Sequence, residues 1–141
     1  MNPIRSLCAV LGGLAVISLV VEALEFSLVT AVSGGRVVDM PQYFAVRNQT
    51  GILAAKLVYN TVAAVLGGYV TARVAMADEI RHAAAAVAAQ TVGLIWGFTA
   101  GEYASYTPIW MRIALVMVMG PAMMMGAAVR ARAAGAQAHE E

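Results

Sequence analysis

Charged residues are scarce in this sequence of 141 residues: they make up 12% of the chain, whereas 61% of its residues are hydrophobic. Soluble domains carry about 25% charged residues, so this composition excludes an ordinary soluble domain. The formal net charge of +1 also removes the basic footprint expected of a nucleic-acid-binding protein. Because Cys8 is the single cysteine, no disulfide forms within one chain, and we expect its thiol to act as a small buried hydrophobe.

Residue patterns that carry chemistry are also missing. The sequence contains no CxxC, HExxH, P-loop or GxSxG spacing, which are the patterns of common redox, zinc, phosphate and acyl-transfer sites. The two histidines, His82 and His139, lie at a helix edge and in the tail, whereas a membrane haem needs axial histidines within the helices. We therefore predict no enzyme activity, no cofactor and no metal site.

A methionine-rich run at 117–125 is the pattern that comes nearest to a metal site. Copper(I) favours thioether ligands. These methionines, however, point in several directions around a helix, and methionine is also a flexible filler of apolar cores. We expect them to fill the core.

Four long apolar blocks dominate what is present, at 4–32, 51–74, 83–100 and 109–129. Each reaches or approaches the roughly 20 residues that a helix needs to cross the hydrocarbon core of a membrane. The blocks predict an all-α fold, a four-transmembrane-helix bundle, with one membrane domain at 1–132 and a cytoplasmic tail at 133–141. The block at 83–100 is the least hydrophobic, so we expect one of its flanks to face protein rather than lipid.

Two connections contain helix starts. Asp39 stands three residues before Gln42, with Pro41 between them, which is the arrangement of a capping box with proline in the first turn. We predict a short interfacial helix at about 40–47. Asp78 or Glu79 is expected to cap the helix of the 83–100 block.

Arginines gather at one set of helix ends. With a cytoplasmic N-terminus, more arginines lie inside than outside, and the positive-inside rule then places both termini in the cytoplasm. The inner set is Arg5, Arg73, Arg81, Arg130 and Arg132, and the outer set is Arg36 and Arg47, with Arg112 near the outer edge.

Small residues indicate where helices pack. Gly93, Gly97 and Gly101 form a GxxxGxxxG row on one helix face, which favours close approach of a neighbouring backbone. Gly67 and Gly126 offer similar grooves on the second and fourth apolar helices. Pro121 lacks an amide proton, so we expect a kink there. The carbonyl freed near Met117 is expected to turn toward a partner or a polar side chain.

Ionisable residues inside the apolar blocks form the candidate site. Glu22 and Glu25 share one helix face, Lys56 and Asn60 share another, and the antiparallel arrangement brings the two pairs to similar depth. Because charges in a membrane are costly, such residues turn inward and pair. Glu102, Arg112 and the deeper Gln90 are the candidates for extending this cluster.

Two interpretations of the cluster remain open. It is either a structural ion pair that determines which helices meet, or a site for a proton, a cation or a cationic substrate. Two acids outnumber the one lysine, which favours the second interpretation because one carboxyl group is left over. The sequence therefore predicts a small accessory or structural membrane protein, with a small oligomeric proton- or cation-linked transporter or channel that uses Glu22 and Glu25 as the alternative. Expected partners are the lipid bilayer and either further copies of the chain or a larger membrane complex.

Two stretches carry a resemblance: GGYVTAR at 67–73 and PIWMRIALVMVMGPAMMMGAAVRAR at 108–132. In these, the chain resembles uncharacterised small bacterial membrane proteins of four helices, with a Gly-Gly-Tyr-x-x-Ala-Arg end to the second helix and a Pro-x-Trp start to the fourth. The resemblance covers roughly the second half of the chain. It implies a bacterial inner-membrane location and no particular activity.

Overall fold

The computed structural model describes residues 3–35 and 39–137, and within these ranges the chain is helical and contains no strand. The elements are α1 (Pro3–Ser33), α2 (Met40–Arg47), α3 (Thr50–Ala75), α4 (Glu79–Ala100), the short 3₁₀ turn η1 (Ala104–Tyr106) and α5 (Ile109–Gln137). The fold is therefore all-α. Four of the helices, α1, α3, α4 and α5, are long and apolar enough to cross a membrane.

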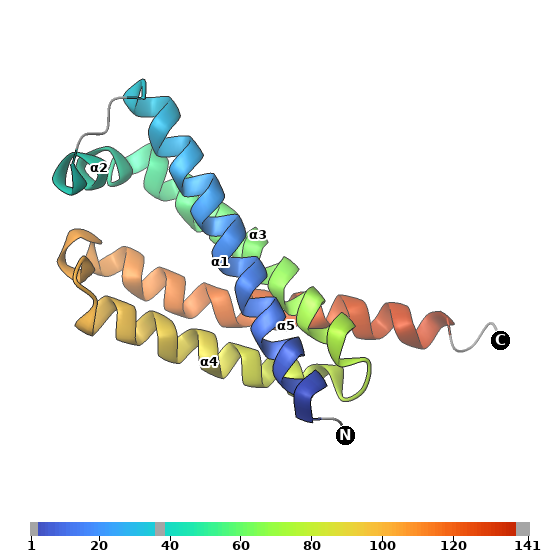
Figure 1. The fold of residues 1–141 in the computed structure, drawn as a ribbon. Helices are drawn as coiled ribbons and strands as arrows, with labels where there is room; N and C mark the ends of the chain where they lie inside the picture. The colour runs from blue at the N-terminus through green and yellow to red at the C-terminus, as the bar shows by residue number, and fades with distance from the viewer. Residues whose placement is uncertain (1–2, 36–38, 138–141) are drawn as a thin grey trace.

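The long helices are arranged around α3, which packs against both α1 and α5. In Figure 1, α4 and α5 form an antiparallel hairpin, and the α1–α3 pair crosses it and diverges from it toward one end. That end carries α2 and η1, and we call it the α2 end. We call the opposite end, where α1 begins and α5 ends, the terminal end.

The short helix α2 coincides with the range expected from its capping residues. The carboxylate of Asp39 accepts a hydrogen bond from the backbone N–H of Gln42 at 2.8 Å, which satisfies one of the free donors of the first turn. Asp78 precedes α4, but its backbone is left-handed, with φ of 49°, and its side chain makes no capping hydrogen bond. The expected side-chain cap from Asp78 is therefore wrong.

The last helix is longer than expected. α5 ends at Gln137 rather than near residue 129, because the segment after 129 is rich in alanine, which has the highest helix propensity. Much of the expected irregular tail is therefore helix. The rest of that tail, with His139, and the loop residue Arg36 lie outside the described residues.

Two glycine-based crossings hold α3 to its neighbours. A Cβ on Gly67 would meet the side chain of Ile17 and the carbonyl oxygen of Gly13 on α1. On the other side of α3, a Cβ on Gly126 of α5 would clash with the carbonyl oxygen of Val65. The helix backbones approach this closely only because side chains are missing at these positions, so the structure places Gly67 and Gly126 in helix contacts, as the sequence predicts.

The glycine row on α4 behaves differently. A Cβ on Gly93 or Gly97 would have no atom within 4 Å, and one on Gly101 would meet only the backbone of Gly97 in its own helix. The expectation that this row packs against a neighbouring helix of the same chain is wrong. The physical reason is the divergence of α1 from α4, because α1 meets α4 near the terminal end and leaves the row uncovered.

The methionine run at 117–125 fills the core only in part: Met119 and Met123 are buried, as the sequence predicts, whereas Met117 and Met125 are 68% and 55% exposed. Met111, Met119 and Met123 are among the largest fully buried side chains, and Met119 and Met123 belong to the main hydrophobic cluster. Cys8, by contrast, is exposed on the surface of α1, so the expectation of a buried thiol is wrong.

Pro121 lies inside α5, which is helical on both sides of it. The side chains of Pro121 and Met117 are exposed on the surface of the bundle. A kink at Pro121 stays a prediction.

Polar contacts join the helices at the terminal end. The guanidinium Nε of Arg5 donates to the carbonyl of Val74 at 2.9 Å, which ties α1 to α3. The imidazole of His82, buried at the start of α4, lies 2.9 Å from the hydroxyl of Ser6 on α1. Because these contacts fix only the terminal end, α1 and α4 are free to diverge toward the α2 end.

The crossing between α3 and α5 is tested by Gly126→Ala, with Gly12→Ala as the matched control. The added methyl group at 126 meets the backbone of α3, and overpacking of this kind costs about 1–3 kcal/mol. Gly12 has open space around its Cβ position, so alanine there should leave stability unchanged or raise it slightly. Thermal unfolding in detergent measures both effects, and equal stability of the two variants would contradict the crossing.

Candidate functional site

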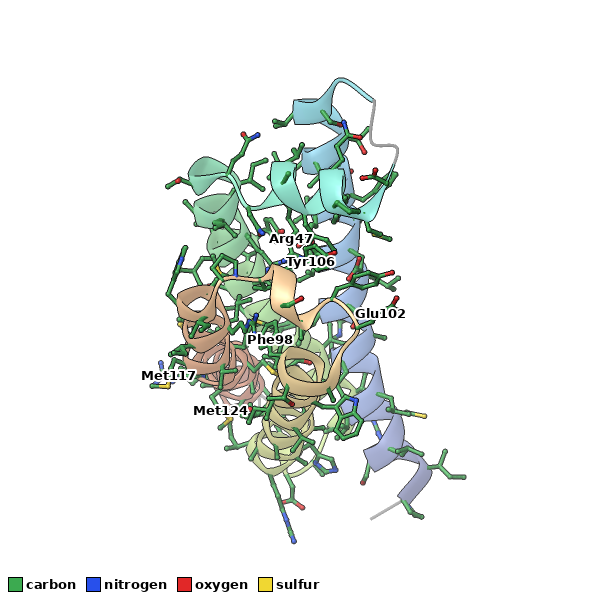
Figure 2. All side chains as sticks on the ribbon, turned by 90° about the vertical axis from the view of Figure 1, so that its left-hand side faces the viewer. Arg47, Phe98, Glu102, Tyr106, Met117 and Met124 are labelled. Carbon is green, nitrogen blue, oxygen red and sulfur yellow. The ribbon has the colours of Figure 1, made fainter. Side chains whose placement is uncertain are left out.

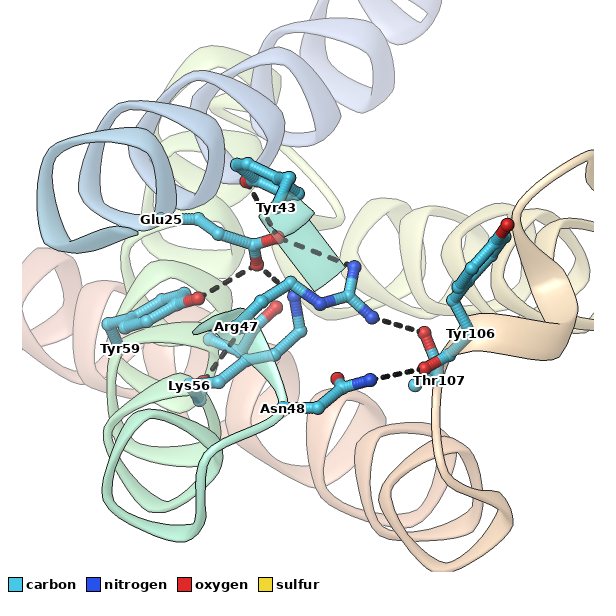
Figure 3. Close-up of polar contacts among 9 residues, drawn as sticks. Glu25, Tyr43, Arg47, Asn48, Lys56, Tyr59, Tyr106 and Thr107 are labelled. Carbon is cyan, nitrogen blue, oxygen red and sulfur yellow. Dashed lines mark hydrogen bonds and ion pairs between the residues drawn. The ribbon is translucent and has the colours of Figure 1, made fainter. Parts of the chain in front are cut away.

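The carboxylate of Glu25 lies at the centre of the candidate site (Figure 3). It is 6% exposed and forms an ion pair with the ammonium group of Lys56 through Oε2. Tyr59 donates its hydroxyl to the same oxygen at 2.8 Å. Tyr43 donates to Oε1 at 3.2 Å, and Nη1 of Arg47 lies 3.5 Å from Oε1. Both carboxylate oxygens are therefore fully engaged.

Three helices supply these groups because of helical spacing. Lys56 and Tyr59 are three residues apart on α3 and project from one face, and Tyr43 and Arg47 are four residues apart on α2. Glu25 is one of the few buried residues on α1. The Glu25 cluster, which we define as Glu25, Tyr43, Arg47, Lys56 and Tyr59, thus joins α1, α2 and α3.

Arg47 also connects the cluster to the α4–α5 loop. Its side chain lies over the ring of Phe44 at 4.4 Å and donates through Nη2 to the hydroxyl of Thr107 at 2.5 Å. Figure 2 shows Arg47 beneath α2 and beside the turn that carries Tyr106. The ring of Tyr106 stacks on that of Phe44 with centroids 4.6 Å apart, so α2 is held to η1 by both polar and aromatic contacts.

Arg47 belongs to the site, although its place in the sequence predicts a cation at the outer membrane surface. The structure buries the residue to 7% exposure. The signal available was the spacing of Tyr43 and Arg47 on one face of a short amphipathic helix. Nothing in the sequence shows that this face turns inward over Glu25.

The other predicted members of the cluster lie near Glu25 without pairing as expected. Asn60 is buried, and its amide donates to the backbone carbonyl of Lys56 at 2.8 Å. Glu22 is exposed on α1. The expected facing pair of Glu22 and Asn60 does not form, because Glu22 is exposed on the surface of α1 whereas Asn60 is buried.

The structure does not bring the predicted extension into the cluster. The guanidinium of Arg112 donates to the carbonyls of Thr107 at 2.6 Å and Phe98 at 3.2 Å, so it closes the loop between α4 and α5. Glu102 is exposed and Gln90 is half-buried on α4. These residues belong to the α4–α5 hairpin, whereas Glu25 lies among α1, α2 and α3.

The charge balance of the buried site is opposite to the expected one. The sequence suggested two acids for one lysine, but the buried groups are one carboxylate, Glu25, with two cations, Lys56 and Arg47. No buried carboxyl group of the Glu25 cluster is therefore left over to carry a proton or a cation. The acid without a buried partner is Glu22, which lies outside the cluster.

Tyr43 remains a hydrogen-bond donor over the physiological pH range. Burial, and next the neighbouring Glu25 carboxylate, together raise the pKa of its hydroxyl to about 12. Because the neutral phenol is the form favoured in the folded chain, its stabilising contribution is present below pH 10 and is lost as the pH rises toward 12.

Two hollows adjoin the Glu25 cluster, and Arg47 and Tyr103 line both. The larger, of about 700 Å³, lies between α1, α2 and the loop after α4, and we call it the α1–α2 cavity. The smaller, of about 290 Å³, runs along the glycine row of α4, and we call it the α4 groove. Within the described residues, no group of three or more His, Cys, Asp or Glu side chains is arranged to hold a metal ion.

Comparison with protein-family models, with curated proteins and with solved structures finds no match to this chain.

Because one buried carboxylate is shared by two buried cations, neutralising Glu25 and neutralising Lys56 should affect protein stability unequally. Glu25→Gln leaves two buried cations without a common counter-ion and should destabilise the protein by about 3–5 kcal/mol. Lys56→Met should cost less, because Arg47 and the tyrosines still contact Glu25. The double variant should be more stable than Glu25→Gln alone, because one of the two unpaired cations is gone.

Unfolding in mixed micelles of increasing SDS content measures these stabilities. Glu22→Gln is the matched control and should be nearly neutral, because Glu22 is exposed. Strictly additive losses for the double variant, or a Glu22→Gln loss as large as that of Glu25→Gln, would contradict this description of the site.

Proposed function

We propose that the chain is a small integral protein of the bacterial inner membrane with a structural or accessory role, and that it assembles with a second copy of itself through α4. The observation that carries the proposal is the uncovered glycine row of α4, where Gly93 and Gly97 have open space. The full set of donors around Glu25 supports a structural role for that acid rather than the alternative of transport.

The low coverage of α4 supports an external partner. The most apolar windows of α3 and α4 have equal mean hydropathy, yet 50% of the α3 window and 11% of the α4 window are buried in the chain. A helix of moderate hydropathy gains less from lipid contact than a strongly apolar one does. The face of α4 that carries its small residues is therefore better suited to protein than to lipid.

Gln90 strengthens the same argument. It stands three residues before Gly93 and seven before Gly97, so it lies on the face of the glycine row. A polar amide in a membrane is satisfied best by another helix, and glutamine side chains hydrogen-bond across helix contacts.

A second copy is the occupant that fits this face. A two-fold symmetric dimer needs a surface that complements itself, and two glycine rows satisfy this because each lets the other backbone approach. The two copies of Gln90 would then lie near one another and could exchange amide hydrogen bonds.

Dimer formation through α4 is tested by disulfide crosslinking in a Cys8→Ala background. Cysteine at Gln90 should give a crosslinked dimer on oxidation, whereas cysteine at Ile95, nearly opposite on the helix, should not. Gly97→Leu should shift native mass spectra in mild detergent from dimer to monomer without loss of thermal stability, and Gly12→Leu on α1 should remain a dimer. The proposal would be overturned if the parent chain is a monomer or if both cysteine positions crosslink equally. It would also be overturned if the cysteine at Gln90 crosslinks only to other proteins.

The proposed orientation places the terminal end in the cytoplasm. The exposed arginines Arg5, Arg73, Arg81 and Arg132 lie on helix ends there, whereas Arg47 and Arg112 at the α2 end are drawn into internal contacts. By the positive-inside rule, this distribution of exposed arginines supports a cytoplasmic terminal end more strongly than the total count of arginines does.

In the Cys8→Ala background, a cysteine at Ser105 should react in intact cells with a membrane-impermeant maleimide. A cysteine at Ala133 should react only after the membrane is opened. Both positions are exposed, so a difference reports the side of the membrane. Labelling of Ala133→Cys in intact cells would reverse the orientation.

A further inference from the structure

The α1–α2 cavity is large enough for a ligand. Its volume of about 700 Å³ falls within the roughly 300–1,000 Å³ that is typical of small-molecule sites. It is separate from the α4 groove that carries the proposed dimer contact, although Arg47 and Tyr103 border both.

Aromatic and apolar side chains line much of this cavity. Phe26 from α1 is 67% exposed and Tyr103 from the loop is 40% exposed, so both rings have surface available to a ligand. The ring of Phe44 is already covered by Arg47 and Tyr106. The available aromatic surface therefore comes from two elements, α1 and the α4–α5 loop.

The charged groups of the cavity are mainly carboxylates. Glu22, Glu25 and Asp39 line it together with one cation, Arg47. Even with Lys56 counted behind Glu25, the acids of this set outnumber its cations by one. Among the described residues at the cavity, the excess charge is therefore negative.

Glu22 provides that excess charge. Its carboxylate forms no hydrogen bond or ion pair with another described residue, whereas Glu25 is saturated and Asp39 caps α2. Arg47 is less available to an anion, because its Nη1 and Nη2 contact Glu25 and Thr107 and its Nε, which has no hydrogen-bond partner, is buried.

We propose that the α1–α2 cavity binds an amphipathic organic cation, with its cationic group beside Glu22 and its apolar body against Phe26 and Tyr103. A cation over an aromatic ring gains electrostatic attraction from the ring, and this adds to its pairing with a carboxylate. An ammonium group on an apolar body matches both the carboxylate of Glu22 and the aromatic rings of Phe26 and Tyr103. The cation is either a soluble amphiphile or the ammonium headgroup of a membrane lipid, since both present the same chemistry.

The proposal is tested with tetraphenylphosphonium, measured by isothermal titration calorimetry on the full chain in dodecyl maltoside. Binding should be saturable, and tetraphenylborate, which has the same shape and the opposite charge, should bind at least about tenfold more weakly. Glu22→Gln should weaken tetraphenylphosphonium binding about tenfold, the effect of losing one close charge pair.

Glu102→Gln is the matched control. Glu102 is an exposed carboxylate at the same end of the bundle that does not line the α1–α2 cavity, so its loss should leave affinity unchanged. Phe26→Leu should weaken binding by removing one ring, while thermal stability stays near that of the parent chain because Phe26 is exposed.

Competition distinguishes the two sources of the cation. Added phosphatidylethanolamine should compete with tetraphenylphosphonium if a lipid headgroup is the ligand, and phosphatidylglycerol should not. If neither lipid competes, a soluble cation is the ligand.

The proposal is overturned if neither tetraphenylphosphonium nor the smaller benzyltrimethylammonium binds. It is also overturned if Glu22→Gln and Glu102→Gln bind tetraphenylphosphonium equally, or if tetraphenylborate binds equally well. The test is independent of the dimer, because Gly97→Leu should bind tetraphenylphosphonium with unchanged affinity.

Discussion

A carboxylate buried among apolar helices is stable only when its charge is paired and both of its oxygens accept hydrogen bonds. Glu25 meets this requirement with groups from two other helices: Lys56 and Tyr59 on α3, and Tyr43 and Arg47 on α2. The short helix α2 has few buried residues of its own, and it is held between Glu25 on one side and Tyr106 and Thr107 of the α4–α5 loop on the other. The electrostatic requirement of one acid thus ties α2 to α1 and α3.

Close backbone contact provides the second constraint. Gly67 lets α3 approach α1, and Gly126 lets α5 approach α3. The polar ties of Arg5 and His82 hold the helices together at the terminal end, and the two helix pairs diverge toward the α2 end. The divergence leaves the glycine row of α4 uncovered and opens the α1–α2 cavity, so the proposed dimer contact and the proposed cation site have the same structural origin.

Local features of the fold were predictable from the sequence. The four apolar helices follow from the length of the apolar blocks, and α2 follows from Asp39, Pro41 and Gln42, because capping acts within one turn. The pairing of Glu25 with Lys56 was also predictable, since antiparallel neighbours place them at equal depth. The unexpected length of α5 shows that low apolar periodicity does not prevent an alanine-rich segment from forming a helix.

Tertiary structure alone decided which members of each candidate set make contact. The glycine patterns on α3, α4 and α5 look alike in the sequence, yet only those of α3 and α5 face a helix of the same chain, because α1 diverges from α4 and leaves the α4 row uncovered. Likewise, Glu22 and Glu25 share a helix face, but only Glu25 lies beneath α2. The sequence by itself determined the helices and their apolar lengths, because these depend on neighbouring residues. Contacts between segments distant in the chain decided the rest, which is the inward position of Arg47, the buried charge balance and the two hollows.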